Sequence, residues 1–133
     1  MLKKVYGKKL SRAQGARRAL FRSLIKALVL NGKIVTTKAK AKSIQGDLDK
    51  IMNKVKKGDL AAQRQVTAML GNDTVTVSKL FKELKGLADE RKSGFTRIIA
   101  LPPRKGDAAA IVRLEWSGKI EKKKSIKKIE KKK

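Results

Sequence analysis

The chain has 133 residues, of which 36 are lysine or arginine and 11 are aspartate or glutamate, so its formal net charge is +25 at pH 7. So large a charge on so short a chain repels itself and favours a polyanionic partner, and nucleic acid is the first candidate. Cysteine and histidine are both absent, which excludes disulfides, thiolate zinc sites and Cys- or His-based catalysis. We therefore expect no catalytic residue, no metal site, no cofactor and no small-molecule substrate.

Membrane insertion and secretion are also disfavoured. No uncharged stretch approaches the roughly 18 apolar residues that a spanning helix requires. The opening residues, Met1 to Lys4, lead into further lysine and not into an apolar signal segment. The expected location is the cytoplasm.

The distribution of charge divides the chain into three parts. Residues 1–46 contain 13 basic side chains and no acidic one, whereas residues 47–118 contain 14 basic and 9 acidic side chains. The stretch from Lys119 to Lys133 has nine lysines and only three apolar residues, too few for a core. We predict a basic N-terminal arm (1–10), a single domain (11–117) and a lysine-rich, disordered C-terminal tail (118–133).

The first predicted element is an amphipathic helix over residues 11–30, with Ser11 as its N-cap and Asn31-Gly32 as its end. Its apolar face, spaced by three and four residues, consists of Leu20, Phe21, Leu24, Ile25 and Leu28. The β-branched run from Ile34 to Thr36 then predicts a short strand.

Three further helices are predicted next. The second is capped by Thr37 and carries the clearest helical stripe of the chain: Ala41, Ile44, Leu48, Ile51 and Val55. Gly58-Asp59 ends the second helix and provides a new N-cap, and the third helix runs from Leu60 to Leu70. The fourth carries its own apolar face and ends at Gly86; that face consists of Val77, Leu80, Phe81 and Leu84.

The last part of the domain is typical of a β-hairpin. Phe95–Leu101 and Ala108–Trp116 are rich in Ile, Val and aromatic residues, and the turn-forming segment Pro102–Asp107 joins them. The predicted fold is therefore α+β, in the order α-β-α-α-α-β-β, with the helices packed on one face of a small mixed three-stranded sheet and with basic terminal extensions.

The candidate RNA-binding residues begin with the basic arm, which contributes Lys3, Lys4, Lys8, Lys9 and Arg12. A solvated terminus without a partner is the alternative. The first helix adds Arg17, Arg18, Arg22 and Lys26, which have no acidic partner nearby in sequence. Guanidinium groups bind phosphate bidentately, so this cluster favours RNA over the alternative of a plain exposed helix face.

Two further clusters are weaker candidates. Lys38, Lys40 and Lys42 lie at the start of the second helix, where free N–H groups and the helix dipole also favour an anion. Arg97 lies on the hairpin, and Arg104 and Lys105 lie at its turn. For both clusters a solvated charged surface is an equally good interpretation.

Aromatic residues are too few for a platform on which single strands would stack. Phe21 and Phe81 lie on apolar helix faces and are expected in the core, so Tyr6 in the basic arm is the one candidate for stacking on a base. The expected mode is recognition of folded RNA through its shape and backbone. A formal Ser-x-x-Lys match, Ser23 to Lys26, lacks its companion motifs and lies in an amphipathic helix, so we interpret it as chance.

Several local strings resemble one known family. The most specific is Ile34–Lys42, Ile-Val-Thr-Thr-Lys-Ala-Lys-Ala-Lys, which is similar to the strand-to-helix signature of bacterial large-subunit ribosomal protein seventeen. Supporting strings in matching order are Leu10-Ser11-Arg12, Ala19–Leu24, Lys79-Leu80-Phe81, Gly94–Ile98 and Gly106–Ala109. The resemblance extends from Lys3 to about Trp116.

The resemblance implies a structural constituent of the large ribosomal subunit that binds its rRNA near the opening of the nascent-chain tunnel and contacts neighbouring ribosomal proteins. The arm, the first helix and the second-helix lysines would then lie against rRNA and hold its segments together by neutralising phosphates. An architectural DNA-binding protein is the main alternative. An enzyme acting on nucleic acid, or a membrane-surface role for the tail, is a weaker one.

Overall fold

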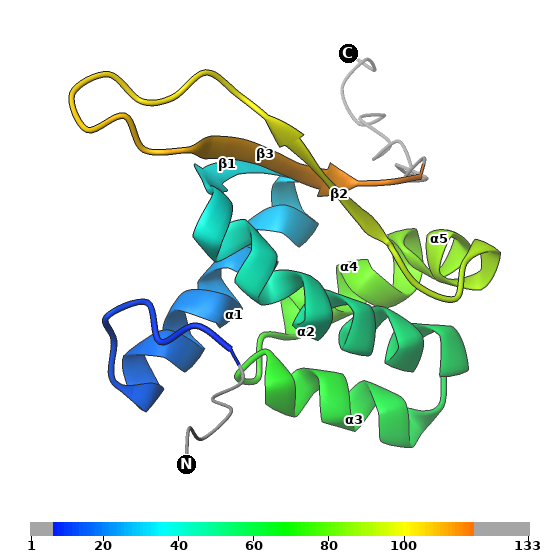
Figure 1. The fold of residues 1–133 in the computed structure, drawn as a ribbon. Coiled ribbons are helices and arrows are strands. Elements are labelled where there is room, and N and C mark those ends of the chain that lie inside the picture. Colours follow the sequence, from blue (N-terminus) through cyan, green and yellow to red (C-terminus); the bar gives the residue numbers. More distant parts are fainter. Residues whose placement is uncertain (1–6, 119–133) are drawn as a thin grey trace, which may run out of the picture.

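A computed structural model of the protein describes residues 7–118. Helices form one layer and a small sheet lies across them as a second layer (Figure 1). The elements in chain order are α1 (Gln14–Asn31), β1 (Lys33–Thr37), α2 (Lys38–Lys57), α3 (Leu60–Met69), α4 (Thr74–Glu83), α5 (Lys85–Glu90), β2 (Thr96–Ala100) and β3 (Ile111–Trp116). The α+β prediction is confirmed.

The sheet has the order β1-β3-β2, with the last strand in the middle. Leu114 on β3 is paired with Ile34 on β1 and with Ile98 on β2, and both pairings are antiparallel. The prediction of a mixed sheet was therefore wrong. Strands β1 and β2 do run in the same direction, but β3 separates them, so within the described residues no parallel pair forms.

Alternation along β3 shows which face of the sheet is covered. Val112, Leu114 and Trp116 are buried, while the residues between them are half-buried. In an antiparallel sheet with one face on a core this alternation is expected. The covered face lies on the helices, as predicted, and the Trp116 indole Nε1–H donates to the Leu28 carbonyl oxygen of α1 at 3.4 Å.

Helix α2 runs through the centre of the core. The predicted stripe is confirmed, since its five members are at most 1% exposed: Ala41, Ile44, Leu48, Ile51 and Val55. Both α1 and α2 end where predicted, because Gly32 and Gly58 adopt the left-handed conformation and donate their N–H groups to carbonyl oxygens of the last turn.

Several helix boundaries differ from the prediction. Helix α1 begins at Gln14 with Ala13 as N-cap, and Ser11 lies in a left-handed turn at φ 51°, so Ser11 is not the cap. Thr37 and Asp59 are at N-cap positions but accept no capping hydrogen bond through their side chains. The chain does not stop being helical at Gly86, because Leu84 keeps a right-handed helical conformation and α5 follows; this short helix was missed.

Candidate nucleic-acid interface

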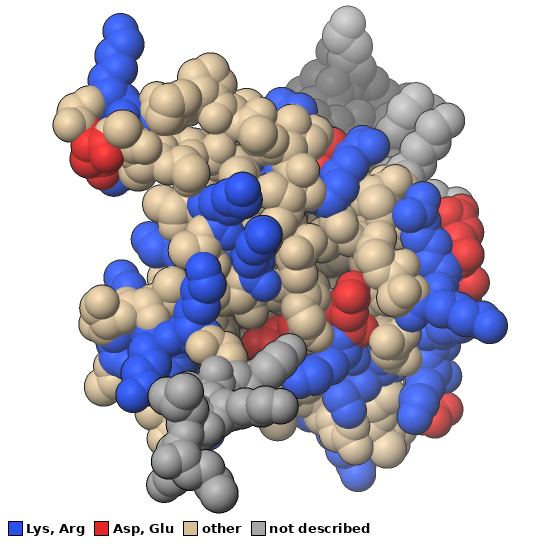
Figure 2. Space-filling view, in the orientation of Figure 1, with Lys and Arg blue, Asp and Glu red and all other residues tan. Residues whose placement is uncertain are grey.

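A hollow of about 680 Å³ lies between residues 7–9, residues 17–21 of α1 and residues 42–50 of α2. We call it the basic hollow. It is lined by Gly7, Lys8, Lys9, Arg17, Phe21, Lys42, Ser43, Gly46, Asp47 and Lys50. Cationic side chains gather on the left of Figure 2, over the start of α1 and the start of α2, whereas the right edge mixes acidic and basic side chains. Three segments that are separate in sequence thus form one positively charged surface.

Five cations line the basic hollow against the single carboxylate of Asp47. Asp47 Oδ1 lies 3.7 Å from Lys50 Nζ, an exposed pair one helical turn apart that contributes little to stability. Within residues 7–118 the other four lining cations form no ion pair: Lys8, Lys9, Arg17 and Lys42. The hollow therefore carries a positive potential that the described part of the protein leaves uncompensated.

Hydrogen bonds to main-chain oxygens fix the turn that leads into α1. Arg17 Nη1–H donates to the Arg12 carbonyl oxygen at 3.1 Å, and Arg12 Nη1–H donates to the Leu10 carbonyl oxygen at 2.7 Å. A guanidinium has five N–H donors, so each of these arginines keeps donors for a further acceptor. The Arg12 backbone N–H also donates to the Lys9 carbonyl oxygen at 3.2 Å, which ties residue 9 to this turn.

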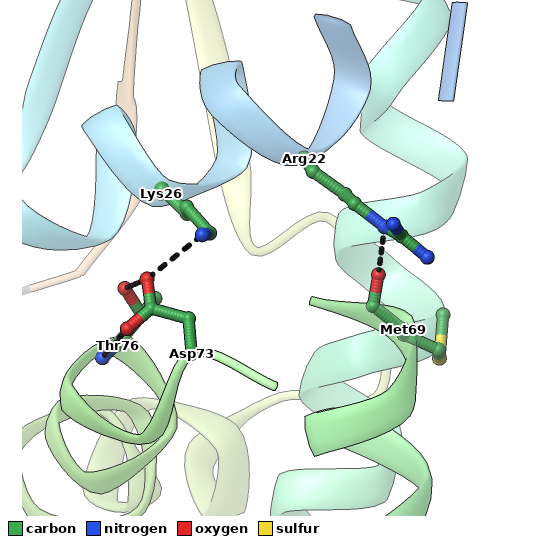
Figure 3. Close-up of polar contacts among 5 residues, drawn as sticks. All are labelled: Arg22, Lys26, Met69, Asp73 and Thr76. Atoms are coloured by element: carbon green, nitrogen blue, oxygen red, sulfur yellow. Dashed lines mark hydrogen bonds and ion pairs between the residues drawn. The ribbon is translucent and has the colours of Figure 1, made fainter. Parts of the chain in front are cut away.

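Further along α1, the half-buried Lys26 is paired with an acidic residue of the same fold (Figure 3). Its Nζ lies 3.1 Å from Asp73 Oδ2, and Asp73 also caps α4 by accepting from the Thr76 N–H and hydroxyl. The Thr76 hydroxyl, followed by Lys26, lowers the pKa of Asp73 to about 2. The sequence argument that no acid neutralises the α1 cluster is therefore wrong for Lys26, because the acid comes from the packing of α4 against α1.

Arg22 has a structural contact of a different kind. Its Nε–H donates to the Met69 carbonyl oxygen at the end of α3 at 3.0 Å (Figure 3). Its guanidinium also packs beside Gly71. The side chain is otherwise exposed, so its outer N–H groups are accessible. Arg18 is exposed on α1 and does not line the basic hollow.

The three lysines predicted as a cluster at the start of α2 do not all line the basic hollow. Lys42 lines the basic hollow, whereas Lys38 and Lys40 do not. The Lys38 N–H donates to the Ala110 carbonyl oxygen at 2.9 Å, so this first-turn amide is already satisfied by the hairpin. The Lys38 amide is therefore not free to bind a phosphate, and the side-chain charges of the three lysines remain the main basis of that prediction.

Cations of the hairpin are largely compensated by acids. Arg97 Nε lies 2.7 Å from Glu115 Oε1, directly across the β2–β3 pair. At the turn Arg104 binds Asp107 through two hydrogen bonds, which raise the pKa of Arg104 and lower that of Asp107 to about 2. Lys105, at the tip, forms no ion pair within the described residues.

Comparison with known proteins identifies the family. Residues 20–117 match the sequence model of the family Ribosomal protein L17. The chain belongs to this family. It is 41% identical to the Large ribosomal subunit protein bL17 of Levilactobacillus brevis, over 82% of this chain and 96% of that protein, and 43% identical to that of Clostridium acetobutylicum, over 81% and 94%. The resemblance found in the sequence is confirmed, and so is the prediction that the chain is not an enzyme.

The described part of this L17-family chain was also compared with what a metal site and a membrane-spanning helix require. Within residues 7–118 no group of three or more acidic side chains is placed to hold a metal ion. No helix there is long and apolar enough to cross a membrane. Lys3, Lys4 and Tyr6, predicted to contact RNA, lie outside the described residues, as does the tail from residue 119.

Sequence reasoning missed four lining residues of the basic hollow, Lys50, Gly46, Ser43 and Asp47, and it also missed that Phe21 lines the hollow. The first two had a signal, because Lys42, Gly46 and Lys50 recur every four residues and so share one face of α2. Phe21 was assigned to the core alone. It does pack against the core, but it is only half-buried, and part of it lines the hollow.

Proposed function

We propose that this L17-family chain is a structural constituent of the large ribosomal subunit in the cytoplasm, where it binds rRNA and holds segments of it together. The relatives that the chain matches over nearly their whole length are named as large-subunit ribosomal proteins. The observation that carries the proposal is the basic hollow, whose four unpaired cations come from the arm, α1 and α2.

The fold explains how these charges act together. Helices α1 and α2 are anchored by fully buried side chains such as Leu28 and Ile44, so the cations on their outer faces stand at fixed separations. Phosphates that bind there release condensed counterions, and this release supplies most of the affinity. A rigid body that binds phosphates from two RNA segments holds those segments at a defined distance.

Neighbouring ribosomal proteins near the tunnel opening are the further partners that the resemblance implies. The sheet face opposite the helices is a suitable contact surface, because Val35 on the edge strand β1 is 63% exposed and Ile99 and Ile111 are only half-buried. Glu115 on the same face is paired with Arg97 and Arg113, so this surface is less cationic than the hollow. Such a surface suits protein better than phosphate.

Salt-dependent binding of the full chain to a large-subunit rRNA transcript tests the proposal. If about six phosphates are neutralised, the slope of log affinity against log salt is roughly −5, and a fourfold rise in salt weakens binding about a thousandfold. Duplex DNA of equal length is the comparison. A flat salt response would overturn the RNA-binding proposal, and equal affinity for both polymers would favour an architectural DNA-binding protein instead.

A further inference from the structure

Gly46 is a residue of α2 that the protein's own packing does not explain. It lies in the interior of a 20-residue helix, where glycine is less stable than alanine. A Cβ built at this position meets no atom within 4 Å, so nothing in the described fold requires its side chain to be missing. Gly46 also lines the basic hollow. The bare backbone therefore leaves room for something that enters the hollow.

Phe21 provides the aromatic surface of the same hollow. Part of its ring packs against the core, which fixes its position, and part lines the hollow. It is the one aromatic side chain among the lining residues. A half-buried ring held in this way is suited to stack on a planar, uncharged ligand group, and an unpaired nucleic-acid base is such a group.

The polar groups of the hollow match the rest of a nucleotide. Arg17 on α1 and Lys42 on α2 supply uncompensated positive charge for phosphate. Asp47 and the Ser43 oxygen supply acceptors, since the Ser43 hydroxyl hydrogen is already donated to the Ala39 carbonyl oxygen at 2.7 Å. The volume of about 680 Å³ lies within the range of small-ligand sites.

We propose that the basic hollow receives one unpaired nucleotide that is extruded from a folded RNA. Its base stacks on Phe21 and its ribose lies against the bare backbone at Gly46. Its phosphates bind the cations of the hollow, Arg17 and Lys42. Because the hollow offers acceptors to the base, an exocyclic amino group is favoured, and uracil, which has none, is the weakest base. This inference rests on the proposed RNA-binding function and specifies which RNA feature is recognised.

The test compares RNA hairpins that differ at one position: an uninterrupted stem, or the same stem with a single bulged A, G, C, U or abasic nucleotide. Binding of the full chain is measured at one fixed salt concentration. We expect an A, G or C bulge to bind about tenfold more tightly than the uninterrupted stem, because stacking of one base is worth that much or more. The abasic bulge should lose this gain, and the U bulge should lose part of it.

The Gly46→Ala variant separates binding from folding. Alanine should raise the Tm by about 3 °C through helix propensity, while its methyl group, projecting into the hollow, should weaken binding of the bulged hairpin about tenfold. Gly86→Ala is the matched control: its Cβ also meets nothing within 4 Å, but Gly86 lies in α5, outside the hollow. It should leave the affinity unchanged.

A second variant addresses the stacking surface. Phe21→Leu keeps an apolar side chain against the core but removes the aromatic face, and should remove the preference for a base over an abasic bulge. The inference is overturned if all hairpins bind equally, or if Gly46→Ala binds the bulged hairpin as tightly as the unaltered protein. In those cases a steep salt dependence would still support the RNA-binding proposal, whereas loss of all RNA binding would refute that proposal as well.

Discussion

Cations that the fold leaves unpaired should contribute to RNA binding, and cations that it pairs with acids should not. Two double variants with the same net charge test this difference. Lys9→Gln with Lys42→Gln removes two unpaired cations of the basic hollow. Arg97→Gln with Arg104→Gln removes two cations that are paired with Glu115 and Asp107. Any effect of total charge alone is equal in the two proteins.

The expected size of the difference follows from counterion release. Each cation that neutralises a duplex phosphate contributes about 0.9 to the magnitude of the log–log salt slope, so the hollow variant should lose about 1.8. At 0.1 M monovalent salt this corresponds to an affinity about 60-fold lower. The affinity of the hairpin variant for RNA should fall less than about threefold, because the positive charges of its two arginines are already compensated by carboxylates in the unaltered protein.

Filter binding to a large-subunit rRNA transcript over about 0.05 to 0.5 M KCl gives both slopes. Both variants should unfold at nearly the same temperature as the unaltered protein, since Lys9 and Lys42 are exposed and the two arginines of the hairpin are exposed as well. Equal slopes for the two variants, or a larger loss for the hairpin variant, would refute the reasoning that intramolecular pairing decides which cations bind RNA.

Other predictions concern stability. The pKa of Asp73 is lowered to about 2, so the ionised carboxylate contributes fully to the free energy of unfolding above the ordinary aspartate pKa near 3.8, and this contribution is lost as the pH falls towards 2. In thermal scans Asp73→Asn should therefore unfold at a lower temperature than the unaltered protein at pH 6, and its unfolding temperature should fall less on acidification. Leu28→Ala should cost about 3 kcal/mol in urea unfolding, because Leu28 is fully buried, and a loss below 1 kcal/mol would contradict this. Gly58→Ala should destabilise by about 1 kcal/mol, because Gly58 ends α2 at φ 72°; a gain in stability would show that the helix end rearranges.

The parts of the fold that depend on local patterns could be predicted from the sequence. The stripe on α2 repeats every three to four residues, so periodicity alone assigns Ala41 and Leu48 to the core. The boundary at Gly32 is equally local. Where a boundary depended on neighbours, prediction failed: α5 was missed because Gly86 is a common helix terminator, yet tertiary packing of Leu87 and Ala88 keeps that turn helical.

The same division applies to the candidate site. The sequence identified most lining cations of the basic hollow because they stand out in an acid-free segment, for example Lys9 and Arg17. It could not show that Lys26 is paired with Asp73, since that contact depends on how α1 packs on α4. It also could not show that Phe21 has one edge in the core and another in the hollow, because helical periodicity gives a direction and not a degree of burial.

The ion pairs of the described residues show a common feature. In all six the acidic partner comes from residues 47–118, and within residues 7–46 only Lys26 takes part. The later part of the chain thus compensates part of its positive charge across its helices and hairpin, whereas the other cations of residues 7–46 remain unpaired. Raising the salt concentration should therefore increase the stability of the free protein, because screening relieves the repulsion among its unpaired cations. It should lower the affinity for RNA, because screening also weakens the attraction of these cations to RNA phosphates. The same charges that destabilise the free protein provide its affinity for RNA.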